Sequence, residues 1–265
     1  MSFDLKTSEG RVLITGAAVG LGRGFAEVFG EAGYRVALVD RNLEAAQKTA
    51  DELKESGIEA LALEADVTRS EDVARVFEEV GEQWSGIDVV INNAGILGPA
   101  KAIEDLSDED LDQVLDVDLK GPFLVCREAV KVMRAGGKGG SILNISSITA
   151  DTGAAVYPAY SAAKAGVIGL TRSMARRCGR YGIRVNCLRP GSILGTRFLE
   201  TSRGSDLNLQ ERLKLKMGLM QKIPIGRAAE SRDIANFALF LASPLAKHIH
   251  GAILTVDGGE ALGSQ

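Results

Sequence analysis

The sequence predicts a single α/β domain in which a doubly wound parallel sheet of about seven strands carries helices on both faces. Short runs rich in β-branched residues alternate along the chain with longer segments of helical periodicity. A length of 265 residues suits one α/β domain. Because no repeat and no linker rich in Pro, Ser or charge divides the chain, we expect residues 1–265 to form one unit.

Seven runs are predicted as strands because they are short and almost continuously apolar. Strands that helices cover on both faces of a parallel sheet have this composition. The predicted strands are 11–15, 35–40, 59–65, 87–92, 140–146, 183–188 and 252–256.

Six longer segments are predicted as helices, at 20–32, 42–56, 70–84, 107–135, 158–181 and 231–241. Glycines occur close after four of them, where helices commonly end: Gly33, Gly57, Gly86 and Gly182. Ser107 precedes Asp110 by three residues, which predicts the capped start of the fourth helix. The strict alternation of strands and helices predicts right-handed crossovers.

Residues 192–229 interrupt this alternation because they contain no strand-like run. We expect a substrate-loop insertion there, since long insertions in compact domains are often lids or binding loops. Apolar residues within it have the spacing of an amphipathic helix: Leu213, Leu215, Met217, Leu219 and Met220. The sequence leaves open whether this helix packs on the core or forms an apolar wall over a substrate.

Composition and charge exclude several classes of protein. The chain is 45% apolar and has a net charge of −4, which disfavours both a disordered chain and a nucleic-acid-binding protein. Its three cysteines, Cys126, Cys178 and Cys187, form no C-x-x-C pair, so we expect reduced thiols and a cytoplasmic location. Acidic residues precede any apolar run at the N-terminus, and no window approaches the ~20 apolar residues of a membrane helix. We therefore expect neither a signal peptide nor a membrane partner.

Histidine and serine chemistry find little support in the sequence. His248 and His250 are the only histidines, and no nearby Cys or carboxylate set completes a metal shell, so no metal site is predicted. The chain also lacks a G-x-S-x-G motif, which disfavours a serine hydrolase.

Glycines gather where the first predicted strand meets the first helix. Residues 15–22 read T-G-A-A-V-G-L-G. Such a turn lets the backbone approach a pyrophosphate, which the N-terminus of the helix then binds. A tight turn with no ligand would have the same composition, so the motif alone leaves both interpretations open.

The second predicted strand ends in Asp40, which bears on the choice of cofactor. A carboxylate there can accept hydrogen bonds from an adenosine ribose and would repel a 2′-phosphate, so we expect NAD rather than NADP. Asp40 could instead simply begin the next turn. Arg41 beside it is a cation of the kind that accommodates a 2′-phosphate.

The glycine spacing G-x-x-x-G-x-G resembles the short-chain dehydrogenase/reductase family, and further motifs of that family follow in order. Residues 92–95 read N-N-A-G, and Tyr160 and Lys164 form Y-x-x-x-K. Ser147 lies 13 residues before Tyr160, which is the family spacing. Pro-Gly at 190–191 and Asp-Gly-Gly at 257–259 complete a resemblance that covers nearly the whole chain and implies a Rossmann-like fold.

The resemblance implies catalytic roles that elementary chemistry supports. Tyr160 and Lys164 lie four residues apart on a predicted helix and so share a face. An ammonium near a phenol lowers the phenol's pKa, which allows Tyr160 to exchange a proton with an alcohol or ketone oxygen. Ser147 can hold that oxygen where charge develops. Lys164 is also implied to bond the nicotinamide ribose.

Two positions depart from the family pattern. Asp118 replaces the family's fourth catalytic residue, an Asn that helps hold a water linking Lys to solvent. A carboxylate there would change the local charge and raise the pKa of Lys164. Thr196 lies one residue later than in the family's P-G-x-x-x-T, so Ile193, through its backbone, is the firmer contact to the nicotinamide.

The resemblance assigns contact residues for the cofactor and the substrate. The cofactor contacts are Gly16, Val19, Gly20, Leu21, Gly22, Asp40, Arg41, Asp66, Val67, Asn93, Ala94, Gly95, Tyr160, Lys164, Pro190, Gly191, Ile193 and Thr196. The substrate contacts are Ile96, Leu97, Thr149, Tyr157 and Ser192, with the segment at 196–220. These side chains are mostly neutral, which favours a neutral alcohol.

The predicted function is NAD-dependent hydride transfer between nicotinamide and a secondary alcohol or ketone. One alternative is an NADPH-dependent 3-oxoacyl-(acyl-carrier-protein) reductase, for which Arg172, Arg176, Arg177 and Arg180 would offer a docking surface; a solvated helix face is the plainer interpretation of these arginines. A nucleotide-binding regulatory protein is the non-enzyme alternative, and Asp118 is the feature in its favour. The resemblance also implies a homotetramer, and small residues at 162–169 on the fifth helix allow close packing.

Overall fold

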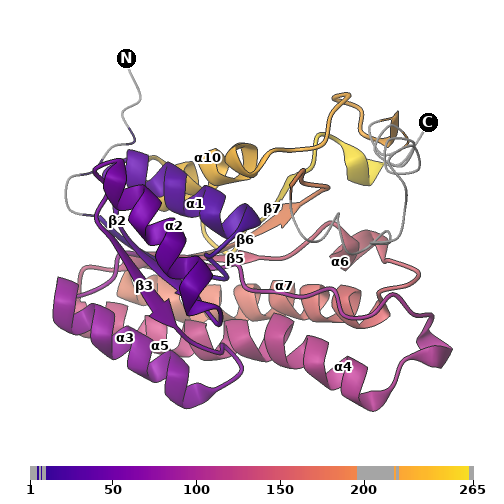
Figure 1. The fold of residues 1–265 in the computed structure, drawn as a ribbon, viewed down its shortest axis with the longest axis horizontal. Coiled ribbons are helices and arrows are strands. Elements are labelled where there is room, and N and C mark those ends of the chain that lie inside the picture. The colour runs from indigo at the N-terminus through magenta and orange to yellow at the C-terminus, as the bar shows by residue number, and fades with distance from the viewer. Residues whose placement is uncertain (1–4, 6, 8–9, 196–217, 219–220, 263–265) are drawn as a thin grey trace.

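A computed structural model describes residues 5, 7, 10–195, 218 and 221–262. Seven parallel strands form one sheet in the order β3-β2-β1-β4-β5-β6-β7 (Figure 1). The strands are β1 (Arg11–Thr15), β2 (Arg35–Asp40), β3 (Ala60–Glu64), β4 (Val89–Asn92), β5 (Gly140–Ile145), β6 (Ile183–Pro190) and β7 (Ile253–Val256). The predicted fold is confirmed, and each predicted strand is present to within two residues at either end.

Helices cover the sheet on both faces, as the alternating sequence pattern predicted (Figure 1). One face carries α1 (Gly20–Glu31), α2 (Leu43–Glu55) and α10 (Ser231–Ala242). The other carries α3 (Ser70–Trp84), α4 (Asp108–Leu115), α5 (Gly121–Gly136) and α7 (Pro158–Cys178). Shorter helical pieces are η1 (Ile103–Asp105), α6 (Thr149–Thr152), η3 (Gly179–Tyr181), η4 (Pro244–Ala246) and η5 (Glu260–Leu262).

Each face of the sheet is closed by an apolar cluster. Phe25 and Phe29 of α1 pack with Ile234 of α10 over β1, and all three side chains are fully buried. On the opposite face of the sheet, Phe77 of α3 and Met133 of α5 are buried in a second apolar cluster. Burial of one such side chain contributes about 1.5–3 kcal/mol, so both helix layers are held firmly on the sheet.

The segment predicted as the fourth helix, 107–135, is not one regular α-helix. Its start is confirmed, because Ser107 and Asp110 each accept a hydrogen bond from the other's backbone N–H. The helix then passes through a π-helical turn, η2 (Asp116–Lys120), where the Gly121 N–H donates to the carbonyl of Asp116, five residues earlier. This turn separates α4 from α5, and π turns of this kind are frequent at functional sites.

The insertion predicted at 192–229 is described only at its two ends. Near its start, Ser192 accepts a hydrogen bond from the Ala229 N–H at 2.9 Å, and Leu194 donates to the Ala229 carbonyl at 2.8 Å. Ile223 and Ala228 are buried together beside Leu194. The predicted apolar helix at 213–220 lies outside the described residues, except for Gly218. Within the part of the chain that the structure describes, no helix is both long and apolar enough to cross a bilayer.

Candidate active site

A cleft of about 960 Å³ opens at the carboxyl ends of the strands, where β1 and β4 lead to opposite halves of the sheet. Ligands of doubly wound sheets bind at such a switch point. The cleft is lined by every residue predicted to contact the cofactor except Thr196, which lies outside the described residues. Each individually named substrate residue also lines it: Ile96, Leu97, Thr149, Tyr157 and Ser192.

The glycine turn packs so tightly that side chains cannot fit within it. A Cβ atom on Gly22 would lie 2.0 Å from the carbonyl oxygen of Gly16. The helix that follows begins after Val19 without a capping side chain and without an acidic residue in its first turn. Its first N–H groups therefore remain available to an anion, so the turn fits a dinucleotide pyrophosphate.

Asp40 is held at the mouth of the cleft by backbone donors. The Ala18 N–H reaches its Oδ2 at 3.1 Å, and the Asn42 N–H reaches its Oδ1 at 3.0 Å. Both bonds fix the carboxylate between the glycine turn and the start of α2. Arg41 lines the same part of the cleft and is exposed.

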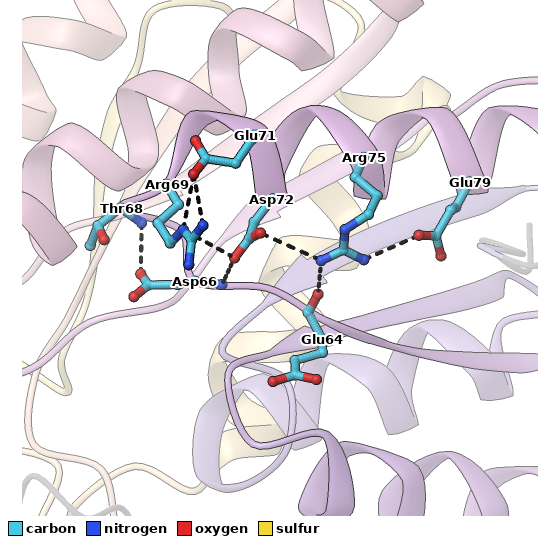
Figure 2. A network of polar contacts seen from close by, with 8 residues as sticks. All are labelled: Glu64, Asp66, Thr68, Arg69, Glu71, Asp72, Arg75 and Glu79. Carbon is cyan, nitrogen blue, oxygen red and sulfur yellow. Dashed lines mark hydrogen bonds and ion pairs between the residues drawn. The ribbon is translucent and has the colours of Figure 1, made fainter.

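The loop after β3 brings Asp66 and Val67 to the cleft and is held by the polar network in Figure 2. Asp66 accepts the Thr68 N–H at 2.9 Å, and its own N–H donates to Asp72 at 3.1 Å. Arg75 of α3 ties the end of the strand by donating to the Glu64 carbonyl at 2.7 Å. The loop is thereby fixed relative to α3.

The N-N-A-G stretch is joined to the glycine turn through Thr15. The Thr15 hydroxyl accepts the N–H groups of Asn93 and Ala94, both at 3.1 Å. The Asn93 amide donates to the carbonyls of Thr15 and Gly16, both at 3.0 Å. Thr15 was not predicted as a site residue, although its place between strand and glycine turn marks it in the sequence.

Tyr160 and Lys164 lie side by side on α7, as their spacing predicted, with the Lys164 Nζ 5.4 Å from the centre of the Tyr160 ring. Both are buried in the protein and line the cleft. Lys164 Nζ also donates to the carbonyl of Ile145 at 3.2 Å. Ser147, just after β5, lines the same part of the cleft, and its Oγ accepts the Thr149 N–H at 3.2 Å.

Asp118 lies behind Lys164 rather than in the cleft. Its side chain is fully buried, and its Oδ2 forms an ion pair with Lys164 Nζ at 3.0 Å. Its Oδ1 accepts the Ile96 N–H at 2.7 Å, which joins the π-helical turn to the loop after β4. A Cβ on Gly95 would lie 2.8 Å from Asp118 Oδ2, so the glycine leaves room for this pair.

Burial and charge set the proton affinities of this cluster. Burial raises the pKa of Tyr160 and the Asp118 carboxylate raises it further, whereas Lys164 and a hydrogen bond with Ser147 lower it, so the pKa lies above its ordinary value. Burial acts to lower the pKa of Lys164, but Asp118 and Tyr160 outweigh it, and that pKa is also raised. The direction of this shift and the ion pair with Asp118 both favour the ammonium form of Lys164 beside the phenol.

Glu260, in η5 near the C-terminal end of the chain, lines the cleft and was not predicted from the sequence. Its Oε2 accepts the Ser192 N–H at 2.7 Å, and its Oε1 accepts the Ser192 hydroxyl at 2.8 Å. Only the fold brings residues so far apart in the chain together. Among the described residues, no group of three His, Cys, Asp or Glu is placed to hold a metal ion.

Comparisons with known proteins place this arrangement in a family. A family profile described as Enoyl-(Acyl carrier protein) reductase matches residues 16–260. Sorbitol dehydrogenase of Cereibacter sphaeroides is 36% identical over 260 residues, which cover 98% of each chain. A 3-oxoacyl-(acyl-carrier-protein) reductase of Staphylococcus epidermidis is 36% identical over 248 residues, covering 93% of this chain and 97% of that protein.

Solved structures agree with these sequence relatives. A putative gluconate dehydrogenase from Agrobacterium tumefaciens superposes with a TM-score of 0.89 at 30% identity, covering 97% of this chain and 98% of that chain. A putative short-chain alcohol dehydrogenase from Sinorhizobium meliloti 1021 gives 0.88 at 30% identity, covering 98% of this chain and 100% of that one.

Fold, cleft and relatives together define a nicotinamide-dependent oxidoreductase built on a doubly wound sheet. The chain belongs to the short-chain dehydrogenase/reductase family. It is an enzyme of that family that acts on CH–OH groups with NAD or NADP as acceptor.

Proposed function

We propose that the chain is an NAD-dependent dehydrogenase that interconverts a secondary alcohol and its ketone. The observation that carries the proposal is the buried pair of Tyr160 and Lys164 beside Ser147 on one wall of the cleft. The choice of NAD is supported by Asp40, whose carboxylate two backbone N–H groups fix beside the glycine turn, because a carboxylate at this strand end can accept hydrogen bonds from an adenosine ribose.

Different residues of the cleft bind different parts of the dinucleotide. The glycine turn and the first N–H groups of α1 hold the pyrophosphate. Asp40 accepts hydrogen bonds from the ribose hydroxyls, and its charge repels a 2′-phosphate. Ile193, through its backbone, contacts the nicotinamide, and Lys164 bonds the nicotinamide ribose. A bound nicotinamide would supply the hydride acceptor for oxidation of the alcohol and the hydride donor for reduction of the ketone.

Three side chains handle the proton and the developing charge. Ser147 donates a hydrogen bond to the substrate oxygen and fixes its position. Tyr160 takes the hydroxyl proton during oxidation and gives it back during reduction. The Lys164 ammonium stabilises the phenolate form of Tyr160 and thereby lowers the barrier to proton removal.

Cofactor choice gives the first test. We expect kcat/KM for NAD to exceed that for NADP by at least about tenfold, or ~1.4 kcal/mol, because a 2′-phosphate would meet the Asp40 carboxylate. Asp40→Ala should narrow the ratio. Asp51→Ala, an exposed carboxylate on α2 outside the cleft, should leave it unchanged. Equal use of both cofactors in the parent would contradict the assignment and point to Arg41.

A second candidate is an NADPH-dependent 3-oxoacyl-(acyl-carrier-protein) reductase, a class that includes a relative at 36% identity. Arg134, Arg177 and Arg180 surround the ring of Tyr181 at 4.9 to 5.6 Å and would offer an acidic carrier protein a cationic surface. Asp40 argues against this second candidate, because its carboxylate would repel the 2′-phosphate of NADPH. A regulatory protein without catalysis would be distinguished from both by the absence of turnover with a panel of secondary alcohols and ketones.

We also propose that the enzyme is a cytoplasmic homotetramer. The cytoplasm suits its three cysteines, each of which is unpaired and buried. The assembly is supported by a largely apolar groove between α4, α5 and α7, lined by Leu115, Leu119, Phe123 and Leu170 together with the ion-paired Asp116 and Lys120.

A further inference from the structure

We propose that Glu260 makes the cleft selective for neutral, hydroxyl-bearing substrates and against substrates with an anionic group. The inference deepens the proposed dehydrogenase function and rests on it. It starts from the two hydrogen bonds between Glu260 and Ser192, the latter a residue of the substrate region.

The direction of these bonds determines what Ser192 offers to a ligand. A carboxylate can only accept, so both the N–H and the hydroxyl hydrogen of Ser192 are committed to Glu260. The hydroxyl oxygen keeps its lone pairs and lines the cleft as an acceptor. A substrate group facing Ser192 must therefore donate a hydrogen bond, which a hydroxyl can do and a carboxylate cannot.

Charge acts in the same direction as hydrogen bonding. Glu260 itself lines the cleft, so an anionic substrate group beside Ser192 would approach a fixed negative charge. Among the described residues that line the cleft, the cations are Arg41, next to Asp40, and Lys164, paired with Asp118. Neither cation is a described partner of Glu260, so the Glu260 carboxylate is stabilised by the two hydrogen bonds that Ser192 donates.

The fold holds Glu260 in a fixed place, which a selective site requires. The turn before it is closed by Asp257, which accepts the N–H groups of Gly259 at 2.9 Å and Ala261 at 2.8 Å. Gly258 accepts the Ile225 N–H at 3.1 Å, and Ser192 accepts the Ala229 N–H at 2.9 Å. The turn that carries Glu260 is thus bonded to both ends of the insertion at 192–229, and Glu260 is a positioning residue for that loop as well.

A matched pair of substrates tests the proposal. Sorbitol and gluconate have the same number of carbons and differ at one end, where a neutral CH₂OH replaces a carboxylate. Propane-1,2-diol and lactate form a second such pair. For the parent enzyme with NAD, we expect kcat/KM for the neutral member to exceed that for the anionic member by at least about tenfold, mainly through KM.

Substitution of Glu260 then separates its charge from its shape. Glu260→Gln keeps the size of the side chain, and its amide can donate to Ser192, so the neutral preference should fall by about tenfold. Glu260→Asp keeps the charge on a shorter side chain and should retain the preference with a higher KM. Glu55→Gln removes an equal charge from the exposed end of α2 and serves as the control.

The possible outcomes distinguish this inference from the proposed function. The role of Glu260 is overturned if the parent uses the neutral and the anionic member equally well. It is also overturned if Glu260→Gln leaves the ratio of their kcat/KM values unchanged. Neither result contradicts the proposed dehydrogenase function. If neither pair is turned over, calorimetric titration of the NAD-bound protein with the same four compounds decides instead. Tighter binding of the neutral member that is lost in Glu260→Gln supports the inference, and equal binding overturns it. No turnover with the wider alcohol and ketone panel would refute the proposed function alone.

Discussion

The ion pair between Asp118 and Lys164 sets how easily Tyr160 gives up its proton. An isolated ammonium beside a phenol would favour the phenolate strongly. Here the ammonium also faces a buried carboxylate at 3.0 Å, which offsets part of its effect. The pKa of Tyr160 is accordingly raised, with burial as the largest cause and Asp118 as a further one.

Replacement of that carboxylate should shift the pH dependence of the reaction. Asp118→Asn removes the negative charge that raises the pKa of Tyr160, so the phenol should titrate at lower pH. The lower limb of the kcat/KM profile for alcohol oxidation should then move toward neutral pH, measured between about pH 6 and 10. An unmoved limb would mean that Asp118 holds the loop through Ile96 and has no electrostatic role.

Removal of the Tyr160 hydroxyl should abolish most of the catalysis. Tyr160→Phe keeps the ring but leaves no transferable proton, so kcat should fall by roughly 10²-fold or more. NAD affinity, measured by calorimetry, should change little. Tyr181→Phe alters a tyrosine on η3, outside the residues that line the cleft, and should keep parental activity. Parental turnover by Tyr160→Phe would refute the assignment.

At the scale of elements, a buried polar network joins β4, β5, α5 and α7 beneath the cleft. Asn144 of β5 accepts from the Asn92 amide at 2.8 Å and donates to the Thr171 hydroxyl at 2.9 Å. Cys126 of α5 accepts from Asn92 at 3.1 Å, and burial raises its pKa to about 12. The network fixes α7, and with it Tyr160 and Lys164, relative to the sheet.

Loss of one member of this network should destabilise the protein. Thr171→Val keeps the shape of the side chain but leaves the Asn144 amide without its acceptor in a fully buried site, at a cost of about 1–3 kcal/mol. Denaturant unfolding of the parent and of Thr171→Val measures the difference. Thr171→Ser retains the hydroxyl and should be the more stable of the two variants. If Val is as stable as Ser at this position, the hydrogen bond is unimportant.

The arrangement of the elements could be predicted from the sequence because the signals are local. Apolar runs define buried strands, helical periodicity defines the layers, and Ser107 marks a helix start that the structure confirms. The positions of Ser147, Tyr160 and Lys164 follow from motifs whose spacing is fixed by a strand end and a helix turn. These signals are sufficient for the fold and for most of the cleft.

Features that depend on contacts distant in sequence could not be predicted. Glu260 meets Ser192 only because β6 and β7 are neighbours in the sheet, and nothing near Glu260 in the sequence indicates this. The π-helical turn at Asp116–Lys120 interrupts a helix that periodicity treats as continuous. The sequence predicts that Asp118 acts on Lys164, but the ion pair between them depends on the packing of this turn against α7.

At the scale of the whole molecule, the helix pair α4 and α5 offers a surface suited to a second copy of the chain. The first turn of α4 is acidic, with Asp108, Glu109 and Asp110, and the last turn of α5 carries Arg134. Antiparallel pairing about a two-fold axis would bring opposite charges together. Phe123 lies between these ends, is 52% exposed and lines the apolar groove.

This surface predicts the mass of the particle in solution. We expect light scattering to give about 112 kDa, roughly four times the chain mass of 28.0 kDa. Phe123→Glu would bury a charge at the proposed contact and should yield smaller species. Ile103→Glu, on an exposed residue of η1 that does not line the groove, should leave the mass unchanged. A parent that remains monomeric at micromolar concentration would refute the tetramer.

The π-helical turn that carries Asp118 also restricts how the gene can change. Such a turn holds one residue more than an α-helical turn, so loss of a single codon within 116–120 would leave an uninterrupted α-helix. The residues on either side would keep the faces that they present now, because the wide turn already absorbs its extra residue within one turn. The packing of α4 on α7 and of α5 on α3 would therefore survive, whereas the widened turn that brings the Asp118 carboxylate to Lys164 would be lost. Deletions of this length, which surface loops tolerate during evolution, should therefore cost this helix its contact with the active site rather than its packing.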